Sequence, residues 1–384
     1  RGKTVPTTEN GHILIATNCI KNENLYPSHE KIRYLSEETY QNWFRAHPKP
    51  GDILFVCKGT PGRVCMVPDP IDFCIAQDMV ALRANEAIVY NKYLLAVLRS
   101  ARIQKQIEQT SVGDVIPHFK KSFFNQLLIP IPPMHIQKII GDYYFAFSEK
   151  VEMNKKINDN LQQHLRTIFK SEFTDNPELE NITQIPLSEL CHVVTKGTTP
   201  TTLGKPFVES GINFIKAESI LDDHSIDKNK FAFIDEETNA LLKRSIIHAG
   251  DVVFTIAGTL GRFALIDENI LPANTNQAVA IIRADVEKVL PEYIYTCFIG
   301  EWHTDYYAKR VQQAVQANLS LTTIKSLPIP LLNEAKMSEY LSLILPLIKA
   351  IKTNEAQNEK LAALRDNLLP KLMSGEINVS AVQL

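Results

Sequence analysis

The feature that most constrains this sequence is an internal repeat with a period close to 200 residues. Gly-Asp-Ile-Leu-Phe at 51–55 returns as Gly-Asp-Val-Val-Phe at 250–254, and the Gly-Thr-x-Gly-Arg of 59–63 returns at 258–262. Order and spacing hold within one or two residues along the 384-residue chain. Solenoid repeats are only about 20–50 residues long, so this period predicts a duplicated globular module.

The first part of each copy mixes short strands with helices. Short β-branched runs between Gly, Pro and Asp are typical of strands, and they occur at 53–55, 64–67 and 79–82, and again at 252–255, 263–266 and 278–282. Helices are predicted at 37–45, 92–110, 236–243 and 291–311. The pattern predicts an α+β module of about 130–150 residues, which is large enough for a core of its own.

The second part of each copy is predicted to be a long helix that follows a Pro-rich stop, at 129–133 and 327–330. From Ile140 to Ile168 the apolar residues alternate in steps of three and four, which is a heptad seam. Neither helix can bury such a stripe alone, so we expect the two to pair as an antiparallel coiled coil. Pro346 is expected to kink or delay the second helix.

Asparagines recur on this seam. Asn154 and Asn158 in the first helix match Asn354 and Asn358 in the second. Polar seam residues fix register at a cost in stability, and their recurrence favours that role. The alternative is that they lie at the edge of an ordinary amphipathic helix.

Four segments follow from the repeat: a first module at 1–130, a helix at 131–176, a second module at 177–328, and a helix with its tail at 329–384. The start of the first copy, Arg1-Gly2-Lys3, aligns with 196–198. The second copy has 185–195 in front of that point. We therefore expect the natural N-terminus to lie upstream, with one short element before Arg1.

Composition and motifs favour a binding protein over an enzyme. The chain is 45% apolar and 22% charged, as expected of a folded protein, and contains no apolar run long enough for a membrane span. Six scattered cysteines without a C-x-x-C pair predict free thiols, a cytoplasmic location and no metal site. No nucleotide, methyltransferase, nuclease or hydrolase motif occurs, so no cofactor or catalytic residue is expected.

The repeated turns carry the first candidates for DNA contact. Arg63 and Arg262 close the two Gly-Thr-x-Gly-Arg turns, where a tight loop could bring backbone close to DNA and arginine to phosphate or guanine. The structural alternative is a hairpin turn whose glycines take positive φ and whose arginine is simply exposed.

Further candidates lie in polar loops and just before strands or helices. Hydroxyls and lysines could contact phosphate, and glutamines could read adenine, but a solvated loop, a turn-closing amide or a helix cap explains them equally. Ser320 in particular resembles an N-cap. The complete set of DNA-binding candidates is Lys3, Thr7, Thr8, Lys58, Arg63, Gln77, His118, Lys120, Lys196, Thr198, Thr199, Lys216, Arg262, Asn276, Gln277, Asn318 and Ser320.

These features together resemble the specificity subunit of type I restriction–modification systems. The most diagnostic stretches are Val-Thr-Lys-Gly-Thr-Thr-Pro at 194–200, the two turns, and Leu-Arg-Asp-Asn-Leu-Leu-Pro-Lys-Leu-Met-Ser-Gly-Glu-Ile at 364–377. The resemblance covers essentially the whole chain. The chain departs from it in the absent N-terminal segment, in Pro346, and in Pro-Pro-Met at 132–134 and Pro-Leu-Leu at 330–332, where the family usually has Pro-Pro-Leu.

The resemblance implies a non-catalytic protein with two target-recognition domains, each reading one half of a split, asymmetric target in double-stranded DNA. It also implies that the helices set the unread spacer and dock two adenine methyltransferase subunits, with restriction–translocase subunits joining for cleavage. The net charge of −2 fits a subunit whose partners supply part of the grip on DNA. Two alternatives remain: a recognition fragment of a fused methyltransferase–nuclease, and a coiled-coil scaffold that binds only protein.

Overall fold

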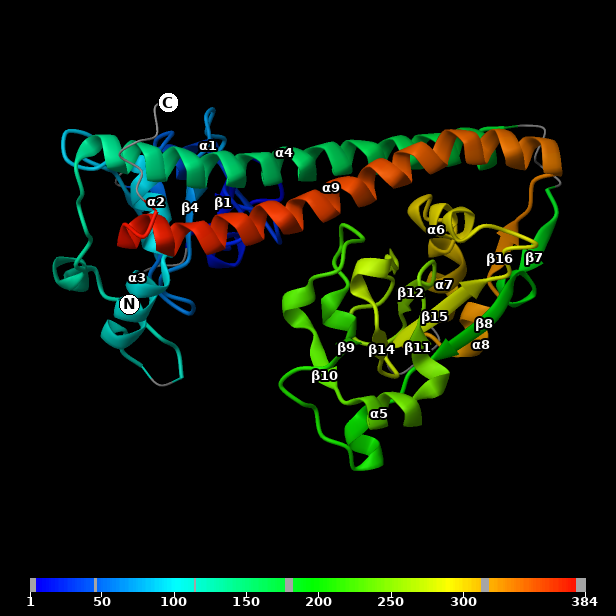
Figure 1. The fold of residues 1–384 in the computed structure, drawn as a ribbon. Coiled ribbons are helices and arrows are strands. Elements are labelled where there is room, and N and C mark those ends of the chain that lie inside the picture. Colours follow the sequence, from blue (N-terminus) through cyan, green and yellow to red (C-terminus); the bar gives the residue numbers. More distant parts are fainter. Residues whose placement is uncertain (1–4, 45–46, 114, 177–181, 312–317, 378–384) are drawn as a thin grey trace. The chain divides into compact units, whose positions relative to one another are not determined.

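The computed structural model describes residues 5–44, 47–113, 115–176, 182–311 and 318–377, and its chain divides into two compact units. The first unit comprises residues 1–154 and 356–384, and the second comprises residues 155–355. Each unit contains one globular module together with a segment of each of two long helices, α4 (Met134–Phe173) and α9 (Glu334–Ser374) (Figure 1). The α+β class expected from the repeat is confirmed.

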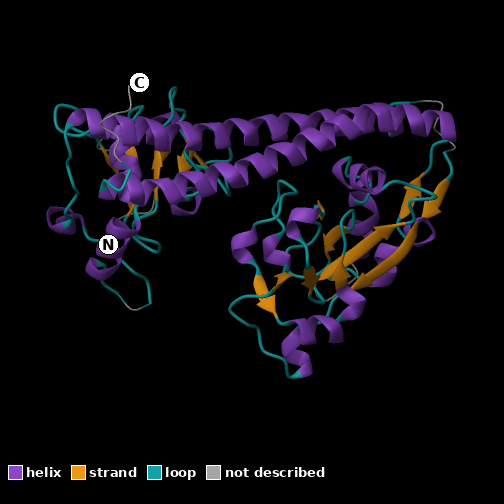
Figure 2. Ribbon diagram, in the orientation of Figure 1, coloured by secondary structure: helices purple, strands orange, loops and turns teal. Residues whose placement is uncertain are grey.

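The first module is built on two three-stranded sheets (Figure 2). One has the order β2-β1-β5, with β1 (His12–Ile15) antiparallel to β2 (Arg33–Leu35) and parallel to β5 (Phe73–Ile75). The other places β3 (Ile53–Val56) between β4 (Val64–Met66) and β6 (Met79–Leu82), all antiparallel. The helices of this module are α1 (Glu37–Asn42), α2 (Asn91–Arg99) and α3 (Ala101–Thr110).

Strand β3 is apolar throughout because both of its faces are buried. Ile53 and Phe55 face α2 and the long helices, while Leu54 and Val56 face the core beside β1 and β5. A strand buried on both faces carries a continuous apolar run without alternation, which is why the predicted 53–55 strand is confirmed.

The second module repeats this plan with more strands. Its sheets have the orders β10-β9-β14-β11, β13-β12-β15-β8 and β16-β7, and β9 is parallel to β14 as β1 is to β5. The strands are β7 (Gln184–Pro186), β8 (Cys191–Lys196), β9 (Ile212–Ile215), β10 (Ala232–Ile234), β11 (Ile246–Ile247), β12 (Val252–Thr255), β13 (Phe263–Leu265), β14 (Ala273–Thr275), β15 (Val279–Ala284) and β16 (Pro328–Pro330). The helices are α5 (Glu236–Leu241), α6 (Pro291–Ile299), α7 (Thr304–Val311) and α8 (Leu321–Lys325).

An ion pair recurs inside both modules and explains part of the repeat. Asp52 accepts two hydrogen bonds from Arg83, at 2.8 and 2.7 Å, and Asp251 accepts two from Arg283, both at 2.7 Å. Both carboxylates are buried, so each needs the paired guanidinium to offset its lost hydration. The repeated Gly-Asp and the arginine some thirty residues later therefore serve the fold.

Two predicted helices are in fact broken. The helix expected at 92–110 stops at Ser100, whose φ of −65° and ψ of 144° are extended, and resumes as α3. The helix expected at 291–311 likewise divides into α6 and α7 around Glu301, which has a φ of 59°. In both copies the apolar pattern continues across the break. A prediction from periodicity alone therefore gives one continuous helix in place of two.

The long helices pair antiparallel within each unit, as predicted. In the first unit Asn154 donates to Gln357 (2.7 Å) and Asn358 (2.9 Å). In the second unit Asn354 donates to Asn158 (2.8 Å), which donates to the carbonyl of Ile351 (3.3 Å).

Pro346 does not delay α9, which begins twelve residues earlier at Glu334 and continues as helix past the proline. Ile344, two residues before the proline, and Ile348, two residues after it, are both buried. Their packing offsets the hydrogen bond that proline cannot donate.

Candidate nucleic-acid interface

In the second module the candidates gather where several strands end. Because β9 and β14 are parallel and Ile215 pairs with Thr275, Lys216 and Asn276 leave the sheet side by side. Lys196 is the last residue of β8 and pairs with Ala280 of β15. Ala280 lies three residues after Gln277, so Lys196 is close to Gln277. Polar and basic residues from three separated segments therefore meet at one end of the two sheets.

Close backbone contact holds this cluster together. The Gly197 amide donates to the Asn276 carbonyl at 3.1 Å, and a Cβ at position 197 would lie 1.8 Å from the Thr275 oxygen. Only glycine fits there. The Thr199 hydroxyl donates to the side-chain carbonyl of Gln277, which leaves the exposed Gln277 amide nitrogen available to a ligand.

Arg244 joins the cluster although sequence reasoning missed it. Its Nη2 donates to the Thr198 hydroxyl at 3.4 Å, and the residue is exposed. The signal that could have found it is the repeat: Arg45 stands at the same place in the first copy, 199 residues earlier. Arg45 lies outside the described residues.

The Gly-Thr-x-Gly-Arg turns have the hairpin geometry that the structural alternative required. The four glycines take φ values of +88°, +91°, +78° and +83°. Arg262 is bound by Asp222 through two hydrogen bonds of 2.6 and 2.7 Å and donates to the Ile220 carbonyl at 3.2 Å. This pairing favours an anchoring role for Arg262, because a phosphate would have to displace Asp222.

The first module places its candidates at the matching end of its sheets. Lys58 follows β3, and its backbone forms an isolated antiparallel β-bridge with His118. Gln77 follows β5 in the same way that Gln277 follows β14. Arg63 closes the turn after β3 and, among the described residues, its side chain has no hydrogen bond or ion pair. The Lys120 ammonium lies 5.7 Å from the centre of the Phe123 ring.

Three candidates near the chain start are arranged differently. Thr8 pairs with Tyr34 of β2, as Val208 pairs with Phe233, so Thr7 and Thr8 correspond to 207–208 and not to the polar loop at 198–199. The Thr8 hydroxyl donates to the Asn10 carbonyl at 2.7 Å. Lys3 lies outside the described residues.

The segment before the long helix differs between the copies, as the sequence indicated. Ser320 accepts a hydrogen bond from the Thr323 amide at 3.0 Å and is therefore an N-cap of α8. Asn318 is exposed just before it. In both copies a matching backbone bond holds this segment, from Phe119 to Cys57 (2.7 Å) in the first and from Leu319 to Ile256 (2.9 Å) in the second.

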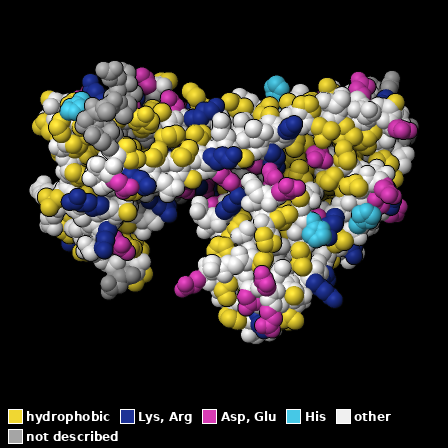
Figure 3. All heavy atoms as spheres, in the orientation of Figure 1, with side chains coloured by type: hydrophobic (Ala, Val, Ile, Leu, Met, Phe, Trp, Pro, Cys, Tyr) yellow, Lys and Arg dark blue, Asp and Glu magenta, His cyan; other side chains and the backbone are white. Residues whose placement is uncertain are grey.

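On the face shown in Figure 3, the basic side chains of the described residues do not form one continuous patch. Lys and Arg are interspersed with Asp and Glu on the face shown in Figure 3, and Lys216 itself pairs with Glu218 at 2.8 Å. Within the described ranges, no cluster of His, Cys, Asp or Glu is arranged to hold a metal, and no helix is long and apolar enough to cross a membrane. The arrangement suits contact with a polar ligand through many separate side chains.

Two α+β modules that present matched polar ends, joined by paired helices, define a class of two-part recognition proteins. Comparison with known families identifies it: the model of the type I restriction modification DNA specificity domain matches residues 3–163 and 180–363. The chain belongs to this family. The family confirms the expectation of a non-catalytic DNA-specificity protein.

Individual relatives agree. The type I restriction enzyme MjaIX specificity subunit of Methanocaldococcus jannaschii is 23% identical over 378 residues, covering 93% of this chain and 84% of the relative. The HindI specificity subunit of Haemophilus influenzae is 23% identical over 414 residues, covering 86% and 87%. Among solved structures, the S subunit from M. genitalium has the same fold, with a TM-score of 0.52 at 15% identity over 96% of this chain and 95% of that one.

Proposed function

We propose that this chain is the DNA-recognition subunit of a type I restriction–modification complex and that each module reads one half of a bipartite, asymmetric target. Two adenine methyltransferase subunits dock on the helices, and restriction–translocase subunits join them for cleavage. The modules correspond to 1–130 and 177–328, and the helical segments to 131–176 and 329–384.

The observation that carries this proposal is the matched end of the sheets in the two modules. Both ends carry a glutamine after the parallel strand, Gln77 or Gln277, and an arginine turn beside it. The surrounding residues differ: Lys58 and His118 stand in one copy where Ala257 and Asn318 stand in the other. Equivalent positions with unlike side chains suit two readers of unlike sequences.

The paired helices suit the role of a spacer. Two readers held at a fixed separation on one face of the duplex would contact half-sites about one helical turn, or 10–10.5 bp, apart from centre to centre. The seam asparagines, which hydrogen-bond across the helix pair, would fix that separation by fixing the register.

The test is to co-express the gene with its methyltransferase partner and map N6-methyladenine in host DNA by long-read sequencing. We expect a split motif of two unlike halves around a fixed gap. A well-formed complex without new methylation would refute DNA recognition, and a continuous short motif would mean that only one module reads DNA.

Matched variants assign each half to a module. Gln277→Ala combined with Lys196→Ala should relax or abolish one half of the motif, and Gln77→Ala with Lys58→Ala should affect the other half. Removing one side chain that reads a base should cost about 1–3 kcal/mol of discrimination. If both double variants changed the same half, or neither changed any, these residues would not be the readers.

A further inference from the structure

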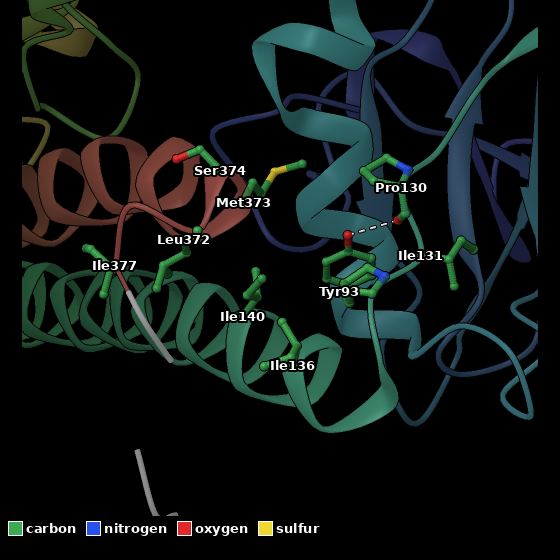
Figure 4. A pocket seen from close by; sticks show the side chains of 11 residues that line it. Tyr93, Pro130, Ile131, Ile136, Ile140, Leu372, Met373, Ser374 and Ile377 are labelled. Atoms are coloured by element: carbon green, nitrogen blue, oxygen red, sulfur yellow. Dashed lines mark hydrogen bonds between the residues drawn. The ribbon is translucent and has the colours of Figure 1, made fainter. Parts of the chain in front are cut away.

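An open groove in the first unit lies beside the Pro-Ile-Pro segment at 130–132 (Figure 4). The groove has a volume of about 500 Å³. Its walls come from Tyr93 of α2, Ile136 and Ile140 of α4, and Leu372 of α9. We call it the 130–132 groove. The Tyr93 hydroxyl donates to the Pro130 carbonyl at 2.9 Å, and the Ile131 side chain is 51% exposed.

The matching place in the second unit is filled. The repeat aligns 129–132 with 327–330, and there Pro328–Pro330 form strand β16, which pairs antiparallel with β7. The Tyr293 hydroxyl donates to the Pro330 carbonyl at 2.6 Å, and in this alignment Pro330 matches Pro132, two residues beyond the Pro130 that Tyr93 contacts. Ile329, the counterpart of the half-exposed Ile131, is 0% exposed.

A short segment after α4 fills that place. Leu187 is fully buried, and Ile182 and Ile185 pack against the same core. The residues between them, Thr183, Gln184 and Pro186, are exposed. Two backbone bonds hold the segment, one from Leu187 to the Leu327 carbonyl at 2.8 Å and one from Leu331 to the Thr183 carbonyl at 2.9 Å.

The sequence contains a second segment of this pattern. Asn-Ile-Thr-Gln-Ile-Pro-Leu at 181–187 corresponds to Asn-Val-Ser-Ala-Val-Gln-Leu at 378–384, so Val379, Val382 and Leu384 have the spacing of the three apolar residues Ile182, Ile185 and Leu187. No side chain of residues 378–384 is charged, which suits an apolar groove, and these residues lie outside the described part of the chain. They directly follow Ile377, which lines the groove.

We propose that residues 378–384 occupy the 130–132 groove as a strand antiparallel to 130–132, completing the first module as β7 completes the second. Backbone bonds to the Ile131 peptide groups would supply affinity, and the three apolar side chains would supply fit. In the register of β7 and β16, which pairs Ile185 with Ile329, Val382 faces Ile131. The tail of the chain then belongs to the core of its first module.

The first experiment uses hydrogen exchange on the full chain with matched variants. Val382→Asp and Leu384→Asp place a charge where the groove would bury it, while Ser380→Asp and Gln383→Asp place one where the strand would face solvent. We expect exchange in peptides covering 126–140 to accelerate about tenfold or more in the first pair and to stay within twofold of the unsubstituted chain in the second. Equal behaviour of all four variants would overturn the proposal.

A cross-link keeps the test decisive if the charged variants fail to fold. Under mild oxidation, Ile131→Cys with Val382→Cys should form an intrachain disulfide, whereas the shifted pair Ile131→Cys with Ser380→Cys should not. Mass mapping distinguishes these bonds from the six native cysteines. An intermolecular disulfide would assign the groove to the tail of a second copy, and no disulfide in a folded protein would leave the groove without this occupant; either result refutes the proposal.

Discussion

Acid should destabilise the second unit through two buried histidines. His224 is 9% exposed and stacks on Phe263 at 4.0 Å between ring centres, and His303 is 8% exposed and meets Phe298 at 5.2 Å. Among the described residues, the Nδ1 of His303 has no hydrogen-bond partner. Burial lowers the pKa of each histidine from 6.5 to about 4.

The charges around His224 act in opposite directions. Arg166 lowers its pKa further, and Asp223 and Asp222 raise it. For His303 the smaller cause is His224 itself, so a proton on one ring disfavours a proton on the other. Desolvation is the larger cause in both cases, and it places the pKa of each ring below that of an exposed histidine.

The sign of the effect follows from proton uptake. Below pH 6.5 the unfolded chain binds protons that the folded chain binds only near pH 4, so the free energy of unfolding falls as the pH falls through this window. At pH 5 the difference is about 2 kcal/mol for each histidine, approaching about 3 kcal/mol near pH 4. Two such histidines can remove a large share of a typical domain's stability.

The assay is urea unfolding at several pH values between 7 and 4.5, followed by Trp302 fluorescence in a Trp43→Phe background, since the chain has only these two tryptophans. His303→Phe keeps an aromatic ring in the cluster and should reduce the pH dependence by about 2 kcal/mol at pH 5. His248→Gln, at an exposed position, should leave it unchanged. Parallel pH profiles for the His303→Phe and unsubstituted chains would refute the reasoning.

Three further predictions concern individual polar interactions. Asp251→Ala should destabilise its unit by about 3–5 kcal/mol because Arg283 loses its buried partner. Asp52→Ala should destabilise its unit less, because the Arg83 side chain is 56% exposed and the Arg283 side chain 25%. Urea unfolding midpoints, at an unchanged slope, would measure both losses of stability, and equal losses would contradict the burial argument. Asn158→Leu and Asn354→Leu should couple by about 0.5–3 kcal/mol in a double-mutant cycle, since each leaves the other amide without its partner; additive losses would show that the bond contributes nothing. Arg262→Ala should cost less than about 1 kcal/mol of stability, because Asp222 is 79% exposed, and should leave target affinity within twofold; a loss of about 1–3 kcal/mol of affinity would instead make Arg262 a base contact.

The repeat made much of the fold predictable. Strand β3 and its matching strand β12 could be predicted as strands because each is a short, largely apolar run between turn residues. Helix α4 could be read from its seam and its Pro-rich start. The short strands β1 and β2 were not predicted, because three or four residues carry too little pattern to distinguish a strand from a loop.

The breaks at Ser100 and Glu301 were missed for a different reason. Each lies within an apolar pattern that suits a continuous helix, yet the backbone leaves the helical conformation there. At Gly300 an added Cβ would lie 2.1 Å from the Phe169 ring of α4, so the turn is set by a residue far away in the sequence. Local propensity does not encode such a long-range contact.

The candidate site shows what a repeat can and cannot assign. Recurrence marked both the Asp–Arg pairs and the turn arginines, yet only the structure separates their roles. Asp251 and Arg283 recur because a buried carboxylate requires its cation, whereas Arg262 is held by Asp222 and Arg63 has no such partner among the described residues. Recurrence alone therefore does not separate positions needed for the fold from positions that contact DNA, and the residues that tell one DNA half-site from the other should be sought where the fold is kept and the side chains differ. Lys58 against Ala257 and His118 against Asn318 are such positions, and each pair lies at the matched end of its sheets. Exchanging Lys58 and His118 for alanine and asparagine should therefore alter the recognised sequence while leaving the stability of the module close to that of the parent.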